Sequence, residues 1–383
     1  MRDQEIIFPN DKNPDFINDL RRKVEGYFKQ NNLSKYGNKT IVIQSVFMGI
    51  LYILPYVLML SGVVTSVLGV MLSWIAMGVG MAGFGMVLMH DANHRVFSRN
   101  QTVNRWLGKS LYLLGGFPPN WRHQHNTLHH GFTNIEGHDE DISPAGFLRF
   151  SPHRELHRVH RFQHIYAWLL YGLMTLSWVT VKDFSRIKNY KKEGVAPFDK
   201  KYGGYLTDLI VSKTFYYLFL LVLPIIVIPV AWYWIVGGFF VMHYVGGLIL
   251  TTIFQTAHVV PSSAYPLPAG DGQVENNWAI HQLLTTSDFS PNSKIFSWMI
   301  GGLNYQVEHH LFPYISHVHY KKLSRLVEET AREYNLPYHY QENFYQAVQS
   351  HWKMLKMLGR QPQEADAQGR KEEFLFSGVS AQG

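Results

Sequence analysis

Hydrophobic residues are gathered into two long stretches that carry no charged side chain. No Lys, Arg, Asp or Glu occurs in the 49 residues from Ile41 to Met89 or in the 45 residues from Thr214 to His258. A helix needs about 20 residues to cross a hydrocarbon core roughly 30 Å thick, so each stretch predicts two membrane-spanning helices. Ser61-Gly62 and Pro229 are the predicted turn positions. The expected spans are therefore about 41–61, 64–89, 214–229 and 231–257.

The charged residues predict how these spans are oriented. All 35 Lys and Arg residues lie outside the two uncharged stretches, so residues 1–40, 90–213 and the chain after 258 share one side of the membrane. The positive-inside tendency places that side, with both termini, in the cytoplasm. Residues 1–40 lack the apolar core of a cleavable signal peptide. The sequence thus predicts an all-α integral membrane protein, with four transmembrane helices in two hairpins and a cytoplasmic helical cap.

This arrangement divides the chain into three parts. They are a cytoplasmic segment over residues 1–40, a membrane domain over 41–340 and a C-terminal segment over 341–383. The residues after about 359 are polar and irregular, which predicts disorder.

The middle segment contains a further apolar patch from His164 to Val181. We expect an interfacial helix there, because a fifth span would move the C-terminal third to the other side of the membrane. Four histidines interleaved with arginines precede the patch and predict a basic amphipathic helix at the level of the lipid headgroups. A metal-binding stripe is the alternative for these four residues, which are His153, His157, His160 and His164.

Composition adds information through charge, cysteine and histidine. The net charge of +7 would allow a nucleic-acid or an anionic-membrane partner, and the uncharged stretches favour the membrane. The absence of cysteine excludes disulfides, iron–sulfur clusters and cysteine zinc sites. Histidine, the commonest protein metal ligand, occurs 20 times. We therefore expect metal chemistry based on imidazole, and no nucleic-acid partner.

Three histidine clusters and one lone histidine lie next to the spans or on the predicted cytoplasmic side. Histidines four residues apart share a helix face, and His130 is expected to be turned by about 100° from His129, toward a second metal. Together the clusters and His258 provide eight imidazoles, enough for two metal ions, with Gln306 as a candidate ninth ligand. The candidate ligands are His90, His94, His125, His129, His130, His258, Gln306, His309 and His310. By contrast His243, at mid-membrane depth, is expected to make a buried polar contact.

The identity of the metal does not follow from the ligand type, because imidazole suits iron, zinc, copper and nickel. The chain has neither the His-Glu-x-x-His motif of zinc proteases nor the Glu-x-x-His pairs of carboxylate-rich di-iron bundles. An all-histidine site for two metals at a membrane surface indicates oxygen activation beside a lipid chain. Removing hydrogen from an unactivated methylene needs a metal-based oxidant, which the protein positions and tunes.

The three clusters read HDANH, HNTLHH and QVEHH, and they resemble the three histidine boxes of the membrane fatty acid desaturases. The resemblance covers roughly residues 40–340, including the stretches 121–141 and 301–320. Gln306 makes the third box similar to that of the front-end group (delta-6 or linoleoyl-CoA type), since the acyl-CoA delta-9 group has histidine there. The resemblance implies two non-haem iron ions, held by the nine candidate ligands above, and O₂ as co-substrate. It leaves supporting roles for Asp91 and Glu308, as residues that orient imidazoles, and for His123, His281, His317 and His319.

The implied activity is the introduction of a cis double bond into a fatty acyl chain carried by CoA or by a membrane glycerolipid. Many front-end desaturases carry a fused cytochrome b5 domain, but its His-Pro-Gly-Gly motif is absent here. A separate cytochrome b5 or ferredoxin, with its reductase, is therefore the expected electron donor. The bacterial inner membrane is favoured over the endoplasmic reticulum.

Two other functions remain open on the sequence. One is a lipid hydroxylase built on the same scaffold, since the box spacing fits both reactions. The other is a non-catalytic or hydrolytic zinc membrane protein, which would need neither O₂ nor a reductant. Under any of these readings His339 and His351, well downstream of the clusters, are expected to tolerate substitution by alanine.

Overall fold

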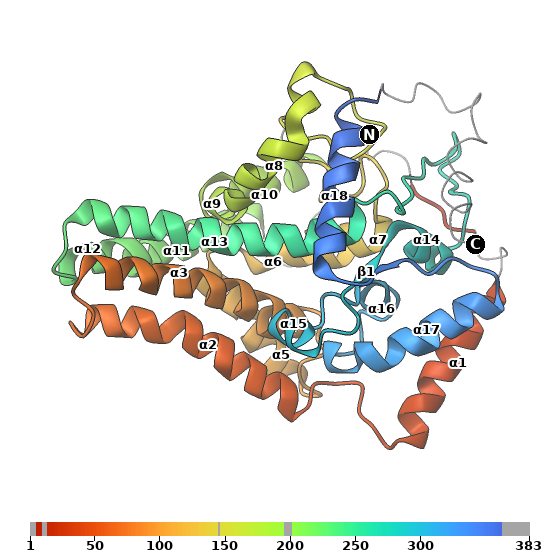
Figure 1. The fold of residues 1–383 in the computed structure, drawn as a ribbon, viewed down its shortest axis with the longest axis horizontal. Helices are drawn as coiled ribbons and strands as arrows, with labels where there is room; N and C mark the ends of the chain where they lie inside the picture. The colour runs from red at the N-terminus through yellow and green to blue at the C-terminus, as the bar shows by residue number, and fades with distance from the viewer. Residues whose placement is uncertain (1–4, 10–13, 145, 195–200, 362–383) are drawn as a thin grey trace.

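The computed structural model describes residues 5–9, 14–144, 146–194 and 201–361, and these residues are mostly helical (Figure 1). Strands are short in this part of the chain. β1 (Asp288–Phe289) and β2 (Tyr340–Gln341) form a two-stranded parallel sheet that pairs Asp288 with Tyr340 and Phe289 with Gln341. A single bridge joins Ile7 to Gln273. The all-α expectation is confirmed.

The first membrane hairpin joins α2 (Lys39–Leu60) to a helix that runs from Val67 to Asn93. This second helix consists of α3 (Val67–Phe84), the π-helical turn η1 (Gly85–Met89) and α4 (His90–Asn93). The chain reverses at Ser61-Gly62, as predicted, and Gly62 takes the left-handed conformation (φ 76°) that glycine adopts without strain. Because the second helix continues past the apolar stretch, its last turn carries the first histidine cluster out of the membrane.

The second hairpin joins a helix from Tyr202 to Val227 to α13 (Trp232–His258). The first of these is made of α11 (Tyr202–Tyr217), η6 (Leu218–Val222) and α12 (Leu223–Val227). It begins twelve residues earlier than the predicted position 214, because Lys213 is accommodated within the helix. Its ammonium lies 2.6 Å from the buried carboxylate of Asp183, and this pairing compensates the charge.

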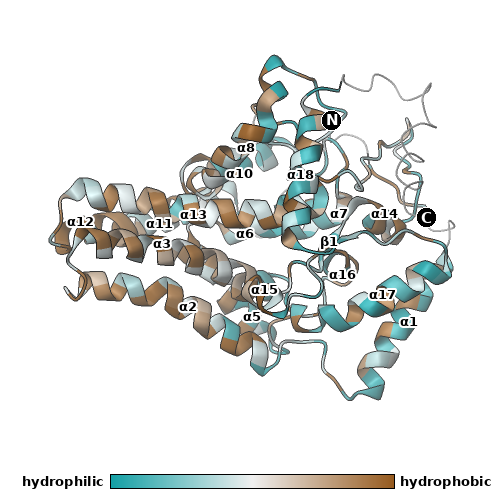
Figure 2. Cartoon of the chain, in the orientation of Figure 1, coloured by the Kyte–Doolittle hydropathy of each residue, from teal (hydrophilic) through white to brown (hydrophobic). Residues whose placement is uncertain are grey.

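All four helices are long and apolar enough to cross a membrane, which confirms the four predicted spans. They extend side by side from one end of the molecule and are themselves predominantly hydrophobic (Figures 1 and 2). The helix α3 packs between α2 and α13 with small residues at both contacts. A Cβ atom on Gly80 would lie 2.5 Å from the backbone nitrogen of Tyr52, and one on Gly78 would lie 2.6 Å from the carbonyl oxygen of Met242. Such close approach of backbones is typical of packed transmembrane helices.

The remaining helices form the cap at the other end, where both α1 and α18 lie (Figure 1). They are α1 (Pro14–Gln30), α5 (Gln101–Gly108), η2 (Lys109–Leu114), α6 (Pro118–Arg122), η3 (His123–His129), α7 (His130–Phe132), η4 (Arg158–Phe162), α8 (Gln163–Gly172), α9 (Met174–Ser177), η5 (Trp178–Lys182), α10 (Asp183–Lys192), α14 (Trp278–Thr285), α15 (Lys294–Met299), α16 (Gln306–Leu311), η7 (His317–His319), α17 (Tyr320–Glu333) and α18 (Phe344–Leu358). The predicted disorder after residue 359 falls largely on 362–383, which lie outside the described residues.

The histidine of the second hairpin makes the buried polar contact that was predicted. His243 is fully buried, its Nε2 lies 3.0 Å from the hydroxyl of Tyr216, and its Nδ1 lies 3.1 Å from Oγ1 of Thr175. These partners come from α11 and α9, so the imidazole joins three helices within the membrane region. Hydrogen bonding of this kind removes the cost of an unsatisfied polar group in hydrocarbon.

The apolar patch of the middle segment forms two helical pieces, Arg158–Gly172 and Met174–Lys192, that meet at a bend of 56°. This bent pair fits the predicted interfacial helix, and as a single broken span it would add a fifth crossing. The predicted basic helix is wrong in its first half, because the chain is not helical before Arg158. His153 instead bonds the carbonyl of Tyr265 at 2.7 Å, and His160 bonds that of Gly146 at 3.0 Å. Because the rings of His153 and His160 bond separate carbonyl groups, these two histidines do not form the alternative metal-binding stripe.

Candidate metal centre

Four separate elements bring the predicted ligands to one place. The end of the second membrane helix supplies His90 and His94, and the end of α13 supplies His258. The segment formed by η3 and α7 supplies His125, His129 and His130, while α16 supplies the third cluster. Except for His94, which is partly exposed, all nine predicted ligands are buried. Residues up to 220 positions apart in sequence thus meet at the boundary between the spans and the cap.

The second cluster is π-helical rather than α-helical, which corrects the predicted geometry. A π-helix bonds residue i to residue i+5, so it brings His125 and His130 onto neighbouring turns. Their Nε2 atoms lie 3.3 Å apart. The rings of His129 and His130, adjacent in sequence, still diverge as predicted, with an angle of 73° between their planes. His125 and His129 still stack, with ring centroids 5.5 Å apart.

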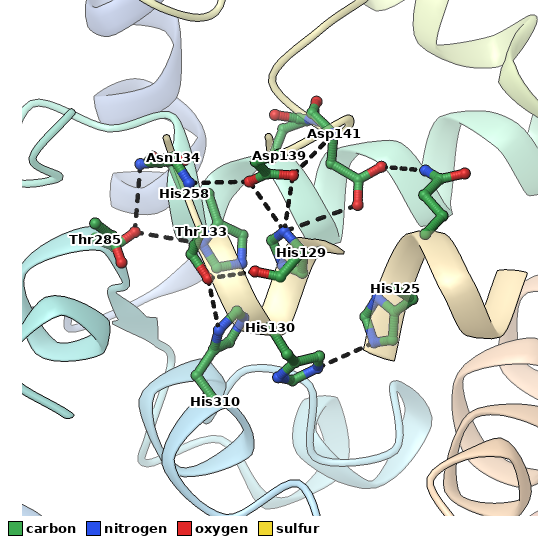
Figure 3. Close-up of polar contacts among 12 residues, drawn as sticks. His125, His129, His130, Thr133, Asn134, Asp139, Asp141, His258, Thr285 and His310 are labelled. Atoms are coloured by element: carbon green, nitrogen blue, oxygen red, sulfur yellow. Dashed lines mark hydrogen bonds and ion pairs between the residues drawn. The ribbon is translucent and has the colours of Figure 1, made fainter. Parts of the chain in front are cut away.

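The imidazoles form two groups of the size that a metal ion requires. In one group the ring nitrogens of His90, His94, His125 and His309 all lie within 4.8 Å of one another, and in the other those of His129, His258 and His310 do so. His130 lies between the groups, with its ring centroid 4.4 Å from those of both His309 and His310. Figure 3 shows His125, His129 and His130 on one helical segment, close to His258 and His310. The arrangement therefore has room for two ions with a shared neighbour.

The donors have the chemistry that metal ligation needs. The buried Nε2 atoms of five histidines have no hydrogen-bond partner among the described residues: His94, His129, His258, His309 and His310. A buried polar atom without a partner costs about 1–3 kcal/mol, and native proteins rarely tolerate several of them at one point. Metal ions would satisfy all five atoms at once, so the residues fit the metal centre that the sequence predicted.

The opposite nitrogens of the same rings are held by neighbouring groups. His129 Nδ1 lies 3.1 Å from Asp139, and His310 Nδ1 lies 2.8 Å from Oε1 of Gln282. His309 Nδ1 lies 3.1 Å from the hydroxyl of Tyr320, and His258 Nδ1 lies 3.3 Å from the carbonyl of Thr285. These contacts fix the ring orientation and leave Nε2 directed inward, which is the usual arrangement around a metal site.

Sequence analysis missed the three side chains among these partners. Asp139 could have been found, because it lies in the acidic run HDED directly after the second cluster. Gln282 and Tyr320 carry no local signal, since each stands in an ordinary helical sequence and reaches its histidine only through the tertiary fold.

The two acidic residues predicted to orient ligands have other partners. Asp91 lies 3.7 Å from Nδ1 of His90, beyond hydrogen-bond distance, and instead contacts His317 at 3.1 Å and accepts a 2.7 Å bond from Ser316. Glu308 accepts a 3.0 Å bond from the hydroxyl of Tyr338 and contacts no ligand imidazole. The expected role is therefore not supported for Glu308, while Asp91 is within ion-pair distance of His90, and Asp139 is a further carboxylate that holds a ligand ring.

The four additional histidines near the boxes lie outside both groups, as expected. His281 Nε2 lies 2.9 Å from the carbonyl of Thr133, and His319 Nε2 lies 3.4 Å from that of Tyr36. His317 contacts Asp91, and His123 packs edge-on against Tyr190 with ring centroids 4.6 Å apart. These contacts are structural.

Gln306 lines the same cavity as His90, His125 and His309, and its side chain also interacts with His258 of the second group. Its Nε2 donates a 2.7 Å bond to the carbonyl of Leu303, which fixes the side chain. Its Oε1 is buried and has no partner within the described ranges. An amide oxygen is an acceptor only, so this atom is suited to a metal ion or to a group bound to one.

Burial keeps most of the cluster uncharged. Desolvation, reinforced by the neighbouring imidazoles, lowers the pKa values of His94, His125, His130, His309 and His310 well below the ordinary value of 6.5. Burial also acts to lower the pKa of His129, but the charge and hydrogen bond of Asp139 outweigh it and raise that pKa. Because a ligating imidazole must be neutral, the low pKa values prepare the site for metal at neutral pH.

A cavity of about 790 Å³ reaches the first group from the membrane side. Its wall includes His90, His125, His309 and Gln306, and much of the rest is apolar. The apolar part includes Met81, Met86, Leu114, Trp121, Trp178 and Phe254. Its size is within the range of small-molecule sites, and its lining suits a hydrocarbon chain.

Comparisons with known proteins agree with this site. Residues 65–342 match the family model described as fatty acid desaturase. The chain is 30% identical to the sn-1 linoleoyl-lipid 6-desaturase of Synechocystis sp., over 89% of this chain and 94% of the relative. It is 33% identical to the acyl-lipid (8-3)-desaturase of Physcomitrium patens, over 92% and 74%, and 30% identical to the sn-1 linoleoyl-lipid 6-desaturase of Arthrospira platensis, over 91% and 94%. The chain therefore belongs to the fatty acid desaturase family, and it is a membrane oxidoreductase that desaturates fatty acyl chains.

Proposed function

We propose that the buried histidine cluster holds two iron ions, and that the enzyme uses O₂ and two electrons to place a cis double bond in a lipid-bound acyl chain. The observation that carries the proposal is the convergence of five unpartnered Nε2 atoms beside an apolar cavity. When bound, the irons would activate O₂ and so supply the oxidant that an unactivated methylene requires.

Different sets of side chains would hold the two ions, fix the rings and position the substrate. His90, His94, His125 and His309 would hold one ion, and His129, His258 and His310 the other, with His130 between them. Gln306 would be a ninth ligand or a close neighbour, through its free Oε1. The partners of Nδ1 keep the rings in place, and the apolar wall excludes water and positions the methylene groups.

Front-end regioselectivity and a glycerolipid substrate are the finer parts of the proposal. The relatives named linoleoyl-lipid 6-desaturase and acyl-lipid (8-3)-desaturase support an acyl chain carried by a lipid rather than by CoA. The glutamine that opens the third box supports the front-end position. We therefore propose that the new double bond forms between an existing one and the carboxyl end.

We also propose that the cap faces the cytoplasm of a bacterial inner membrane and receives electrons from a separate donor, either cytochrome b5 or a ferredoxin with its reductase. The helices α1 and α17 pack together through a shared apolar cluster and expose Arg21, Arg22, Lys322 and Arg325. The two helices together carry eight Lys and Arg residues against six Asp and Glu residues. Because such carriers are typically acidic, this small positive excess would favour their encounter. The helix α17 begins at Tyr320, whose hydroxyl contacts His309, so the surface is connected to the cluster.

The test is metal analysis of purified protein together with O₂ uptake and product analysis. We expect two irons per chain, and a desaturated product only when O₂, a carrier and its reductase are all present. A hydroxylated product would reject the proposed reaction, and product formed without O₂ would reject the oxidative mechanism. Zinc in an inactive preparation would not count against iron, because zinc competes well for imidazole sites.

A further inference from the structure

The cavity reaches the protein surface at one defined place. Two of its lining residues, Phe147 and Val181, are 64% and 62% exposed, and Ser185 and Asn189 beside them are also exposed. They come from the loop before η4 and from the segment formed by η5 and α10. The inner lining, by contrast, comes from membrane helices and includes Met81 and Leu250. The cavity therefore runs from an opening beside α10, past the histidines, toward the membrane core.

The surface around this opening has the composition of a membrane interface. On the adjoining bent pair of helices, Phe162, Ile165 and Leu169 are largely exposed. Exposed basic residues flank them, namely Arg158, Arg161, Lys188, Lys191 and Lys192. Exposed apolar side chains next to lysine and arginine are typical of segments that lie among anionic lipid headgroups.

One cation in the cavity wall has no direct ion-pair or hydrogen-bond partner among the described residues. Arg186 forms an ion pair with Glu140, which also accepts a 2.9 Å bond from the hydroxyl of Tyr190. Asp141 accepts a hydrogen bond from Gln124 and lies 3.8 Å from Nδ1 of His129. Lys182 lines the same wall and is half-buried. Glu140, Asp141 and Asp183 are its electrostatic neighbours, but it forms no direct ion pair or hydrogen bond with any described residue. A partly desolvated ammonium without a partner is stabilised when an anion binds to it.

We propose that Lys182 binds the phosphate of a phospholipid headgroup, and that the lipid loads its acyl chain sideways from the surrounding leaflet through the opening beside α10. The chain would then pass His90, His125 and His309 and continue toward Met81 and Leu250. The headgroup would hold the carboxyl end close to the opening, so the first methylene groups to reach the metal site are those nearest the carboxyl. This inference rests on the proposed function for the identity of the chain, and it adds the headgroup site and the route.

A phosphate is also present in acyl-CoA, so the test compares three probes with the same linoleoyl chain. They are dilinoleoyl phosphatidylglycerol, the uncharged dilinoleoyl monogalactosyldiacylglycerol and linoleoyl-CoA. Binding to the purified full chain is measured by native mass spectrometry, which needs no turnover. The variants are Lys182→Met, Lys182→Arg as the charge-conserving change, and Lys29→Met as the control, because Lys29 is an exposed lysine on α1 that neither lines the cavity nor belongs to the basic residues around its opening.

We expect Lys182→Met to weaken phosphatidylglycerol binding about tenfold, as the loss of one charge-assisted contact predicts. Binding of the galactolipid should be unchanged, Lys182→Arg should restore most of the affinity, and Lys29→Met should resemble wild type. Equal phosphatidylglycerol affinity in Lys182→Met and wild type would overturn the headgroup site. A Lys182-dependent preference for linoleoyl-CoA would overturn loading from the leaflet.

The outcome is separable from that of the proposed function. If the predicted lipid preference is found in protein that forms no double bond, the headgroup site stands and the desaturation proposal fails. If desaturation is found without a lipid preference that depends on Lys182, the desaturation proposal stands and the headgroup site fails.

Discussion

Asp139 Oδ2 lies 3.1 Å from Nδ1 of His129, and both side chains are fully buried. The same carboxylate accepts 2.9 Å bonds from the backbone nitrogens of Asn134 and Asp141, so its position is fixed by the loop that follows the second cluster. A buried carboxylate that holds one ring nitrogen directs the other toward a metal and increases its basicity. Asp139 is therefore a positioning residue, although no sequence motif of the boxes includes it.

Replacing this carboxylate should weaken the metal site without changing its shape. In Asp139→Asn the side chain keeps its size but loses the charge that holds His129. We expect a 10- to 100-fold loss of metal affinity or activity, the usual cost of removing such a partner. Iron content and rate are measured beside Asp15→Asn, an exposed change on α1. Wild-type iron affinity in Asp139→Asn would exclude the positioning role.

The structure revises the expectation for one of the two downstream histidines. His351 is fully buried, with Nε2 2.6 Å from the hydroxyl of Tyr171 and Nδ1 2.7 Å from the carbonyl of Val259. His351→Ala removes both hydrogen bonds and leaves a cavity, so the free energy of unfolding should fall by about 1–3 kcal/mol. His339 is half-buried, and its side chain has no hydrogen bond among the described residues, so the original expectation holds for it.

Thermal unfolding in detergent separates the two variants. His351→Ala should melt several degrees below wild type, whereas His339→Ala should melt at the wild-type temperature. Equal melting temperatures for all three proteins would show that the buried bonds of His351 contribute nothing.

The metal-free protein should lose stability as the solution becomes acidic. The folded-state pKa values of His94, His125, His130, His309 and His310 are lowered, so below pH about 6.5 the unfolded chain takes up protons that the folded chain resists. The contribution of these histidines to stability is therefore fully present above pH about 6.5 and decreases as the pH drops below that value. His129 acts in the opposite sense, since its raised pKa favours the protonated folded state, and so do Asp288 and Glu308, whose pKa values burial raises. These three groups are outnumbered by the five histidines.

The measurement is the melting temperature of metal-free protein between pH 7.5 and 5.5. It should fall with pH, and the fall should be smaller in a variant that replaces His130 and His310 by asparagine. A melting temperature that rises on acidification would contradict the assigned directions.

Gln306 tests whether the amide in the third box shapes the chemistry. Its Oε1 is free while its Nε2 is bound to Leu303, so Gln306→His replaces an oxygen by a stronger nitrogen donor. We expect this variant to keep both metals and lose most activity, and Gln306→Glu to impair turnover by adding a negative charge beside the ions. Product formation and iron stoichiometry are compared with wild type. Wild-type rate and double-bond position in Gln306→His would leave this glutamine no role in the reaction.

The features that sequence predicted well are those set by composition over many residues. Four spans follow from the absence of charge, since the hydrocarbon core imposes a minimum length on each. The ligands follow from the clusters because imidazole has few other reasons to gather at one membrane boundary. The start of the third span was missed because Lys213, read as a boundary, is neutralised by Asp183 from a distant helix.

The contacts around the ligands could not be read in the same way. Gln282 reaches His310 and Tyr320 reaches His309 only after α14, α16 and α17 have packed, and neither pair has a fixed spacing. The π-helical form of the second cluster was likewise invisible, because the spacing of its histidines fits an α-helix equally well. Local patterns therefore predicted the candidate donors, while tertiary packing determines which atom of each ring points into the cluster.

The most direct test of the central claim is the fatty acid profile of a host that lacks polyunsaturated lipids, supplied with linoleic acid and expressing this protein. Gas chromatography–mass spectrometry then locates any new double bond, with His309→Ala as the inactive control. We predict a new cis double bond between the existing bonds and the carboxyl end, recovered in glycerolipids and absent from the control. A double bond on the methyl side, a hydroxylated product, or an unchanged profile from iron-loaded protein would contradict the account.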